Sequence, residues 1–342
     1  MVKQMLAFLL LCALLLSLGA CGKAQPVTQT PETPSASGTP ESPAEPEPPT
    51  EPVEPDVPQE EEPGFTPGTL EYTAPAQRRE VKNILLIGNS FSYSLVEELY
   101  ALGKEAGYEL NVCNLYKAGC TVIEHWSWLS DPEKGQGKYG FWVTNSKGWN
   151  KVLVDTSIQE ALAYAEWDVI TLQQHFAPKT SKIYAVAKNS CTPYVQNLFD
   201  YLKANFPDAD LFWYETWAYE VGHSEVRKVD VQTKQYKSIQ QVSWELCREN
   251  DVPMIPAGDA WQIARNDATV GDDLCKDDKA HDGEEGGGQY LNACVFFEVL
   301  FGKSCVGSTW RPTYALPEEK IPGLQQAAHE AVAAIYGENY AK

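Results

Sequence analysis

The sequence has few basic residues for its length. Lys and Arg together number 27 against 47 Asp and Glu, and the formal net charge of the 342 residues is −20. A nucleic-acid partner requires clustered Lys and Arg that neutralise phosphates, so this balance argues against DNA or RNA binding. An acidic domain is compatible with neutral substrates such as acylated sugars.

Common metal and redox motifs are also missing. The nine cysteines include no Cys-x-x-Cys pair, so the sequence does not indicate a zinc ribbon or a thioredoxin-type site. Cys12 and Cys21 lie near the N-terminus, and the others are an odd number that cannot all pair within one chain. For these, one or two disulfides and buried free thiols both fit an exported protein. They are Cys113, Cys120, Cys191, Cys247, Cys275, Cys294 and Cys305.

The first strand-like segment lacks two well-known loops. It is followed neither by Gly-x-x-x-x-Gly-Lys, which would bind phosphate, nor by the Gly-x-Ser-x-Gly nucleophile elbow. It ends instead in Gly88-Asn89-Ser90. A serine in such a turn can simply cap the next helix. Ser92 or Ser94 could fill that role equally well, which would leave Ser90 free.

The first 21 residues have the layout of an export signal. Lys3 precedes an apolar run over residues 5–18, and small residues precede Cys21. The run is too short for a comfortable membrane span. The sequence Leu-Gly-Ala-Cys resembles a bacterial lipobox, in which the cysteine is lipidated, and the alternative is an ordinary signal peptide with a chance cysteine. We expect an exported protein, anchored to the bacterial cell membrane only by a lipid on Cys21, with its domain facing outside.

Residues 22–79 are predicted to be a disordered linker. They are rich in Pro, Glu, Thr and Ser and poor in large apolar residues, so they cannot bury enough surface to offset the entropy of ordering. Frequent proline makes such a segment extended. The remaining residues, 80–342, fit a single α/β domain.

In that domain, strand-like apolar runs alternate with segments of helical spacing. This alternation predicts a parallel sheet covered by helices on both faces, with ligands bound at the carboxyl ends of its strands. The expected strands are residues 81–87, 109–115, 167–172, 210–214 and 252–256. The expected helices are residues 95–106, 158–165, 194–205, 231–250, 289–301 and 324–336.

Glycine and polar residues follow these strands. Gly119 comes after the second strand, where glycine either permits an unusual backbone angle or lets a backbone N–H approach a ligand. Gln173-Gln174-His175 ends the third strand, where amides and imidazole are costly unless paired. Asp278 and His281 stand three residues apart before a glycine-rich connection into a helix.

The order of these features resembles that of the SGNH (GDSL-type) hydrolases. The segments IGNSFS, LQQ, ETWAY and HDGEEGGGQYLNA further resemble the DUF4886 branch of that superfamily, over roughly residues 81–302. Asn89 stands where Asp is usual, and Gln173, or alternatively Gln174, stands where Asn is usual. The resemblance implies a flavodoxin-like three-layer α/β/α fold.

The resemblance also implies a serine-hydrolase site. Ser90 would attack an ester carbonyl, while His281 would take its proton and pass it to the leaving alcohol. Asp278 would orient the imidazole, although Asp277 and Asp282 also flank His281 closely.

An oxyanion hole would complete this site. Its donors would be the backbone N–H groups of Ser90 and Gly119 and the side-chain amide of Gln173. No metal or cofactor is implied.

Aromatic residues near the strand ends offer faces that suit sugar rings, although they could equally belong to the core. Candidate substrate contacts are Asn89, Gln174, His125, Trp126 and Trp217, with Trp128, Tyr219 and His175 in comparable positions. We expect a carboxylic ester hydrolase that removes O-acetyl groups from carbohydrate. The alternatives are a non-catalytic surface lipoprotein that binds glycans, and a lipase or thioesterase that acts on acyl chains.

Overall fold

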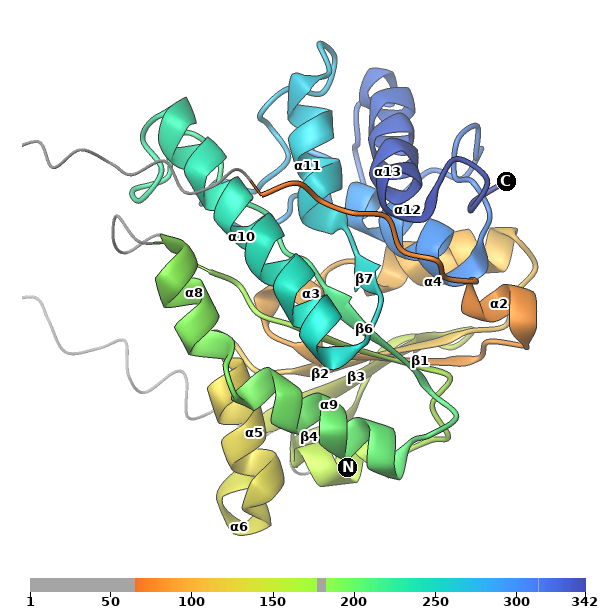
Figure 1. The fold of residues 1–342 in the computed structure, drawn as a ribbon. Coiled ribbons are helices and arrows are strands. Elements are labelled where there is room, and N and C mark those ends of the chain that lie inside the picture. The colour runs from red at the N-terminus through yellow and green to blue at the C-terminus, as the bar shows by residue number, and fades with distance from the viewer. Residues whose placement is uncertain (1–64, 177–182, 313) are drawn as a thin grey trace, which may run out of the picture. The chain divides into compact units, whose positions relative to one another are not determined.

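A computed structural model describes residues 65–176, 183–312 and 314–342. At its centre, the described chain forms a seven-stranded sheet in the order β4-β3-β2-β1-β5-β6-β7 (Figure 1). The strands are β1 (Asn83–Gly88), β2 (Asn111–Tyr116), β3 (Tyr139–Asn145), β4 (Gly148–Thr156), β5 (Val169–Gln173), β6 (Asp210–Tyr214) and β7 (Met254–Ile255). The run β2-β1-β5-β6-β7 is parallel and has the flavodoxin-like order, so the predicted fold is confirmed.

An antiparallel hairpin extends the predicted sheet beyond β2. β3 runs antiparallel to β2, and β4 runs antiparallel to β3 and forms one edge of the sheet. Buried and partly exposed residues alternate over most of β3, as expected for a strand with one covered face. The sequence analysis assigned no structure to residues 139–156, so the expectation of a purely parallel sheet is corrected at this edge.

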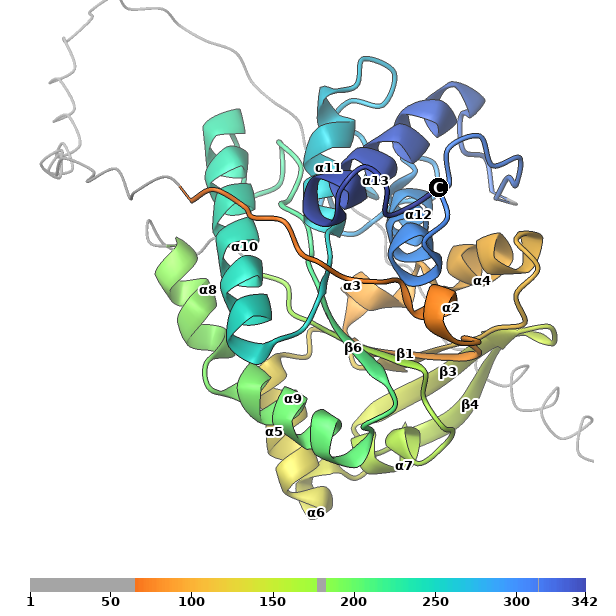
Figure 2. The same ribbon diagram turned by 45° about the vertical axis from the view of Figure 1, so that its right-hand side comes forward.

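Helices cover both faces of the sheet (Figure 2). One face carries α2 (Pro75–Arg78), α4 (Val96–Glu105), α11 (Ala257–Asn266), α12 (Gly288–Phe301) and α13 (Ile321–Tyr336). The other carries α5 (Val122–Ser130), α7 (Ile158–Leu162), α8 (Ile183–Cys191), α9 (Tyr194–Asn205) and α10 (Val229–Asn250). Successive residues of β1 alternate between the two layers: Ile84 and Leu86 pack in the first core, and Leu85 and Ile87 in the second.

The predicted helices and strands are confirmed to within a few residues, and α9 and β6 have the predicted ends. Three helices of more than two turns, α5, α8 and α11, were not predicted.

Within the described chain, no helix is both long and apolar enough to cross a membrane. All seven cysteines of the domain are buried free thiols. Of the two alternatives, disulfides and free thiols, the structure therefore has the free thiols.

The folded domain begins earlier than predicted. Ala74 is fully buried, the Tyr72 hydroxyl donates to Asp210 Oδ1 at 2.6 Å, and the Leu70 N–H donates to the Ile335 carbonyl at 2.7 Å. These contacts place residues 65–79 in the domain and correct the linker boundary at residue 79. The predicted signal peptide, Cys21 and the linker up to residue 64 lie outside the described residues.

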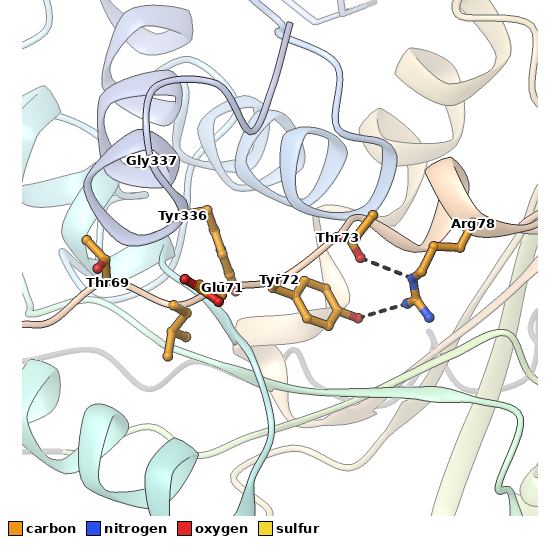
Figure 3. Close-up of a pocket in the computed structure, with 8 residues that line it drawn as sticks. Thr69, Glu71, Tyr72, Thr73, Arg78, Tyr336 and Gly337 are labelled. Atoms are coloured by element: carbon orange, nitrogen blue, oxygen red, sulfur yellow. Dashed lines mark hydrogen bonds between the residues drawn. The ribbon is translucent and has the colours of Figure 1, made fainter.

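This N-terminal segment and the end of α13 enclose an open hollow of about 750 Å³ (Figure 3). Arg78 lies in its lining and donates to the Thr73 carbonyl at 3.2 Å and to the Tyr72 hydroxyl at 3.3 Å. Arg78 also forms an ion pair with Asp210. Its charge is therefore already used to attach the N-terminal segment to β6.

Two acids, Glu98 of α4 and Asp282, are buried in the domain. Glu98 is 5% exposed, and its Oε2 has no hydrogen-bond partner among the described residues. Burial raises the pKa of Glu98 to about 8 and that of Asp282 to about 6. Both groups are therefore protonated in the folded protein at pH values where they would be ionised in the unfolded chain.

These pKa values predict that the domain is most stable at mildly acidic pH. Between about pH 4 and about pH 8 the unfolded state releases protons that the native state retains, so the free energy of unfolding falls as pH rises. Between these two pH values, the free energy of unfolding of Glu98→Gln should fall by roughly 2–4 kcal/mol less than that of wild type, because glutamine has no proton to lose. Denaturant titrations at several pH values would measure this difference. Glu109→Gln, an exposed change beyond the end of the same helix, is the control. Equal pH slopes in both variants would contradict the assignment.

Candidate active site

The turn after β1 presents Ser90 without using its side chain for capping. Asn89 is the N-cap of the one-turn helix α3 (Ser90–Tyr93), and its Oδ1 accepts from the Phe91 N–H at 3.0 Å. The cap is therefore an asparagine and none of the nearby serines. This leaves the Ser90 hydroxyl available for another partner.

That partner is His281. Ser90 Oγ lies 2.8 Å from His281 Nε2, although the two residues are 191 positions apart in the chain. On the other side of the ring, His281 Nδ1 bonds to Asp278 Oδ2. If Nδ1 carries the proton, as a carboxylate partner favours, Nε2 is free to accept the Ser90 proton. The structure thus brings together the three residues that the sequence singled out.

Asp278 is held in place by the backbone that follows it. Its Oδ1 accepts from the Ala280 and His281 N–H groups, both at 3.0 Å. Burial alone would raise the pKa of Asp278, but the N–H donors of His281 outweigh this and lower it. A carboxylate that stays ionised in this position fixes both the tautomer and the direction of the imidazole.

The two competing acids do not orient His281. Asp282 is 1% exposed and points to Ser94 Oγ and to Asn292 Nδ2. Within the described chain, no hydrogen bond joins Asp277 to the His281 ring. Asp278 is therefore the residue that completes the arrangement.

Two unpaired backbone donors lie beside Ser90. Within the residues described, neither the Ser90 N–H nor the Gly119 N–H has a hydrogen-bond acceptor. The turn that carries Gly119 is held against the two residues before Ser90, because the Lys117 N–H donates to the Gly88 carbonyl at 3.3 Å and Asn89 Nδ2 donates to the Cys120 carbonyl at 2.9 Å. Gly119 has φ +63°, a backbone angle that favours glycine.

Gln173, the third predicted donor of the oxyanion hole, bonds to Asn89. Its side chain is buried, and its Nε2 donates to Asn89 Oδ1 at 2.8 Å. The amide packs so closely over Gly88 that a Cβ there would come within 2.5 Å of Nε2. The long side chain thus positions the capping Asn89 with one of its two N–H groups. Its role in the oxyanion hole stays a prediction.

Gln174, the alternative, is also occupied. Its Oε1 accepts from the Val122 N–H at 2.8 Å, and its Nε2 donates to Ser190 Oγ at 3.3 Å. It therefore joins the start of α5 to α8, which corrects the expectation that it contacts substrate.

Three other predicted substrate contacts are buried. Asn89 is 6% exposed and uses both polar atoms of its side chain internally. His125 is fully buried, with Nδ1 2.8 Å from the Tyr139 hydroxyl, and burial lowers its pKa to about 3. Trp217 is fully buried, stacks on Trp261 at 4.3 Å and donates to the Ala280 carbonyl at 2.9 Å. These three assignments are therefore corrected to structural roles.

Trp126 lies on α5 rather than in a loop, where it remains partly exposed. Its role as a substrate contact stays a prediction.

An aromatic layer lies beneath the imidazole of His281. The Phe91 ring stands 5.3 Å from the His281 ring, 4.1 Å from His175 and 4.7 Å from Trp217. Burial, followed by the nearby His281 and His223, lowers the pKa of His175 to about 3. His175 is therefore neutral, so it adds no charge that would repel a protonated His281.

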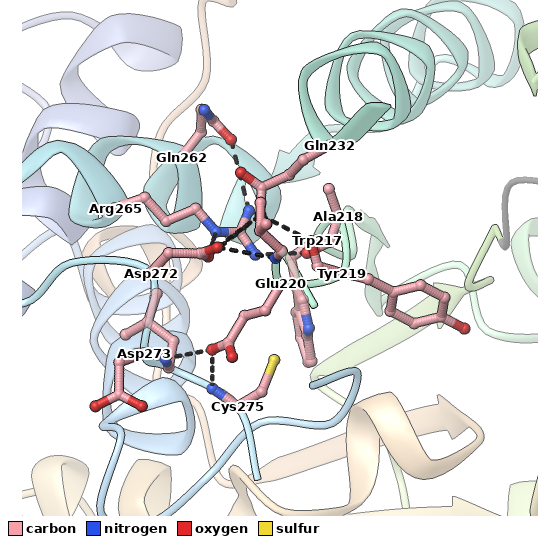
Figure 4. A network of polar contacts seen from close by, with 12 residues as sticks. Trp217, Ala218, Tyr219, Glu220, Gln232, Gln262, Arg265, Asp272, Asp273 and Cys275 are labelled. Carbon is pink, nitrogen blue, oxygen red and sulfur yellow. Dashed lines mark hydrogen bonds and ion pairs between the residues drawn. The ribbon is translucent and has the colours of Figure 1, made fainter. Parts of the chain in front are cut away.

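The sequence analysis missed the residue that anchors the loop carrying Asp278 and His281 (Figure 4). Glu220 is 1% exposed, and its Oε1 accepts from the Leu274 and Cys275 N–H groups, both at 2.6 Å. The Glu220 N–H also donates to the Lys279 carbonyl at 2.9 Å. One buried acid after β6 thus holds this loop at two points.

An ion pair supports the same loop. Arg265 Nε lies 2.7 Å from Asp272 Oδ1, and the Arg265 guanidinium donates to the Ala218 carbonyl at 2.6 Å. Asp272 in turn accepts from the Val221 N–H at 2.9 Å. The loop is thereby fixed to residues 218–221, and no spacing or motif in the sequence marks these partners.

We expect Glu220→Ala to slow the reaction of Ser90 with a fluorophosphonate probe about tenfold or more, because small displacements of a reacting group have large kinetic effects. Glu220→Gln keeps an acceptor oxygen without the charge, so its rate should lie between that of Glu220→Ala and wild type. Thermal melts would verify that the variants are folded. Glu225→Gln, an exposed change in the same segment, should react like wild type. Full reactivity of Glu220→Ala would show that the carboxylate does not position the site.

Comparisons with known proteins agree with this architecture. A DUF4886 family protein from Bacteroides uniformis has a TM-score of 0.65 and 25% identity, covering 77% of this chain and 98% of that chain. A lipase/acylhydrolase from Enterococcus faecalis has a TM-score of 0.42 and 15% identity, covering 69% and 100% of the two chains. An acetylxylan esterase from Geobacillus stearothermophilus has a TM-score of 0.40 and 12% identity, covering 69% and 98%. A search of curated proteins found no match.

The family model described as "Domain of unknown function (DUF4886)" matches residues 83–331, which include Ser90, Gly119, Asp278 and His281. Since this match spans most of the chain, the protein belongs to the DUF4886 family.

Proposed function

We propose that the domain is a serine esterase of the SGNH type. The observation that carries this proposal is the hydrogen-bonded series from Ser90 Oγ through His281 to Asp278. A serine hydroxyl is a weak nucleophile without an adjacent base, and this geometry supplies one. The unpaired N–H groups of Ser90 and Gly119 support the same reading, because they are the donors that an ester oxyanion needs.

The reaction would proceed in two steps. Ser90 Oγ attacks the ester carbonyl while His281 Nε2 takes the hydroxyl proton, and the carbonyl oxygen becomes an oxyanion bonded to the two backbone N–H groups. The tetrahedral intermediate collapses, the C–O bond to the alcohol breaks, and His281 returns the proton to the leaving alcohol. Water then attacks the acyl-serine with His281 as base, releases the acid and restores Ser90.

The proposed substrate is an O-acetylated carbohydrate. The net charge of −20 favours a neutral substrate over an anionic one. His281 and Asp278 retain side-chain exposures of 35% and 49%, so the dyad lies at the surface where a polymeric substrate can reach it.

Ser90→Ala is expected to lower kcat for p-nitrophenyl acetate by about 10³-fold or more, since it removes the nucleophile. Asp278→Asn should lower kcat by about 10²-fold or more, because an amide holds the imidazole in the wrong tautomer. Asp277→Asn is the matched control and should leave kcat unchanged. Release of acetate from acetylated xylan should follow the same order. Equal rates for wild type and Ser90→Ala would eliminate the esterase proposal.

We further propose that the protein is exported and lipid-anchored through Cys21, on the basis of its N-terminal sequence. In a bacterial host, Cys21→Ser should move the protein from the membrane fraction to the soluble fraction, and labelled palmitate should mark only the unchanged protein. Palmitate incorporation into Cys21→Ser would show that the anchor lies elsewhere.

A further inference from the structure

Four aromatic rings meet where the antiparallel hairpin joins the parallel part of the sheet. Tyr93 lies 4.7 Å from Tyr116, 5.8 Å from Trp142 and 4.9 Å from Trp149, measured between ring centroids. Trp142 and Trp149 are 5.2 Å apart. These four residues, here called the hairpin aromatic cluster, come from α3, β2, β3 and β4 in turn.

The cluster is continuous with the candidate active site. Tyr93 belongs to the same helical turn as Ser90, three residues further on, so the two side chains start from neighbouring positions. Tyr116 is the last residue of β2 and leads directly into the turn that carries Gly119. The cluster therefore begins at both segments that supply the proposed nucleophile and oxyanion donors.

The four rings of the cluster are partly exposed to solvent, unlike the aromatic rings of the core. Trp217 and Trp261 stack with no exposure, whereas all four cluster residues keep part of their surface accessible, and Trp149 is 36% exposed. Gly140 is the partner of Tyr116 in the strand register, so β3 contributes no side chain at that level. Since β4 is the edge of the sheet, no other strand of the described chain lies beyond Trp149.

We infer that the hairpin aromatic cluster is a binding subsite for a neutral sugar ring of the acylated polymer whose ester is cleaved at Ser90. This inference rests on the proposed function. Indole and phenol rings offer apolar faces to the C–H groups of a sugar, and their N–H and O–H groups can bond to its hydroxyls. A ring bound here would place the polymer chain along the hairpin, with its acetylated unit toward Ser90.

The test separates binding from hydrolysis. Binding of xylohexaose, cellohexaose and mannohexaose to the full-length Ser90→Ala protein would be followed by tryptophan fluorescence and calorimetry. We expect at least one of these sugars to bind, and Trp149→Leu in that background to weaken its Kd about tenfold, because leucine keeps an apolar side chain without a ring face. Trp149→Phe should retain part of the affinity.

Tyr164→Leu is the matched control. Tyr164 is 45% exposed and packs edge-on at 4.9 Å against Phe141, which belongs to the core on the other face of the same hairpin. Its substitution should leave sugar binding unchanged. In the catalytically intact protein, Trp149→Leu should raise KM for acetylated xylan about tenfold and leave kcat/KM for p-nitrophenyl acetate unaltered.

Three results would overturn the subsite. The first is that none of the three sugars binds. The second is that Ser90→Ala binds the sugar equally well with and without Trp149→Leu. The third is that light scattering shows a dimer that Trp149→Leu converts to a monomer. The last result would show that a second copy of the chain covers the cluster. Failure of the proposed function would look different, because Ser90→Ala would then hydrolyse p-nitrophenyl acetate as fast as wild type.

Discussion

The loop that brings His281 within hydrogen-bond distance of Ser90 is attached to the rest of the fold by a buried carboxylate, that of Glu220. Asp278 and His281 lie on a loop with little regular structure, and the side chain of Glu220 holds that loop through two backbone N–H groups. Because this acid is 1% exposed, its bonds to the loop are shielded from water. The fold thus supports His281 both from the segment after β6 and from the backbone of its own loop.

The sheet order explains why the site forms where it does. β1 is central in the parallel run, with β2 on one side and β5 on the other, so the segments that follow these three strands meet at one edge. Ser90, Gly119 and Gln173 all lie in or next to these strand ends. Parallel strands place their carboxyl ends together, and that is the geometric basis for joining residues far apart in sequence.

The sequence was sufficient for the parallel core, because buried strands read as apolar runs. For the Ser90–His281–Asp278 series, the information came from the resemblance to the SGNH hydrolases. The sequence was insufficient for the direction of individual side chains. Gln173 turns toward Asn89 because Gly88 leaves room for it, and this contact requires the packed turn. Trp217 could not be told from a surface aromatic, whereas Trp142 and Trp149 lie in a hairpin whose strands were not predicted at all.

The thiols of this domain have a structural consequence. All seven of its cysteines are buried and unpaired, and burial raises the pKa of Cys113 and Cys191 to about 12. Thiols in this state are poor nucleophiles and poor substrates for oxidants. The fold of the described domain is therefore held together by packing and hydrogen bonds without a disulfide bond.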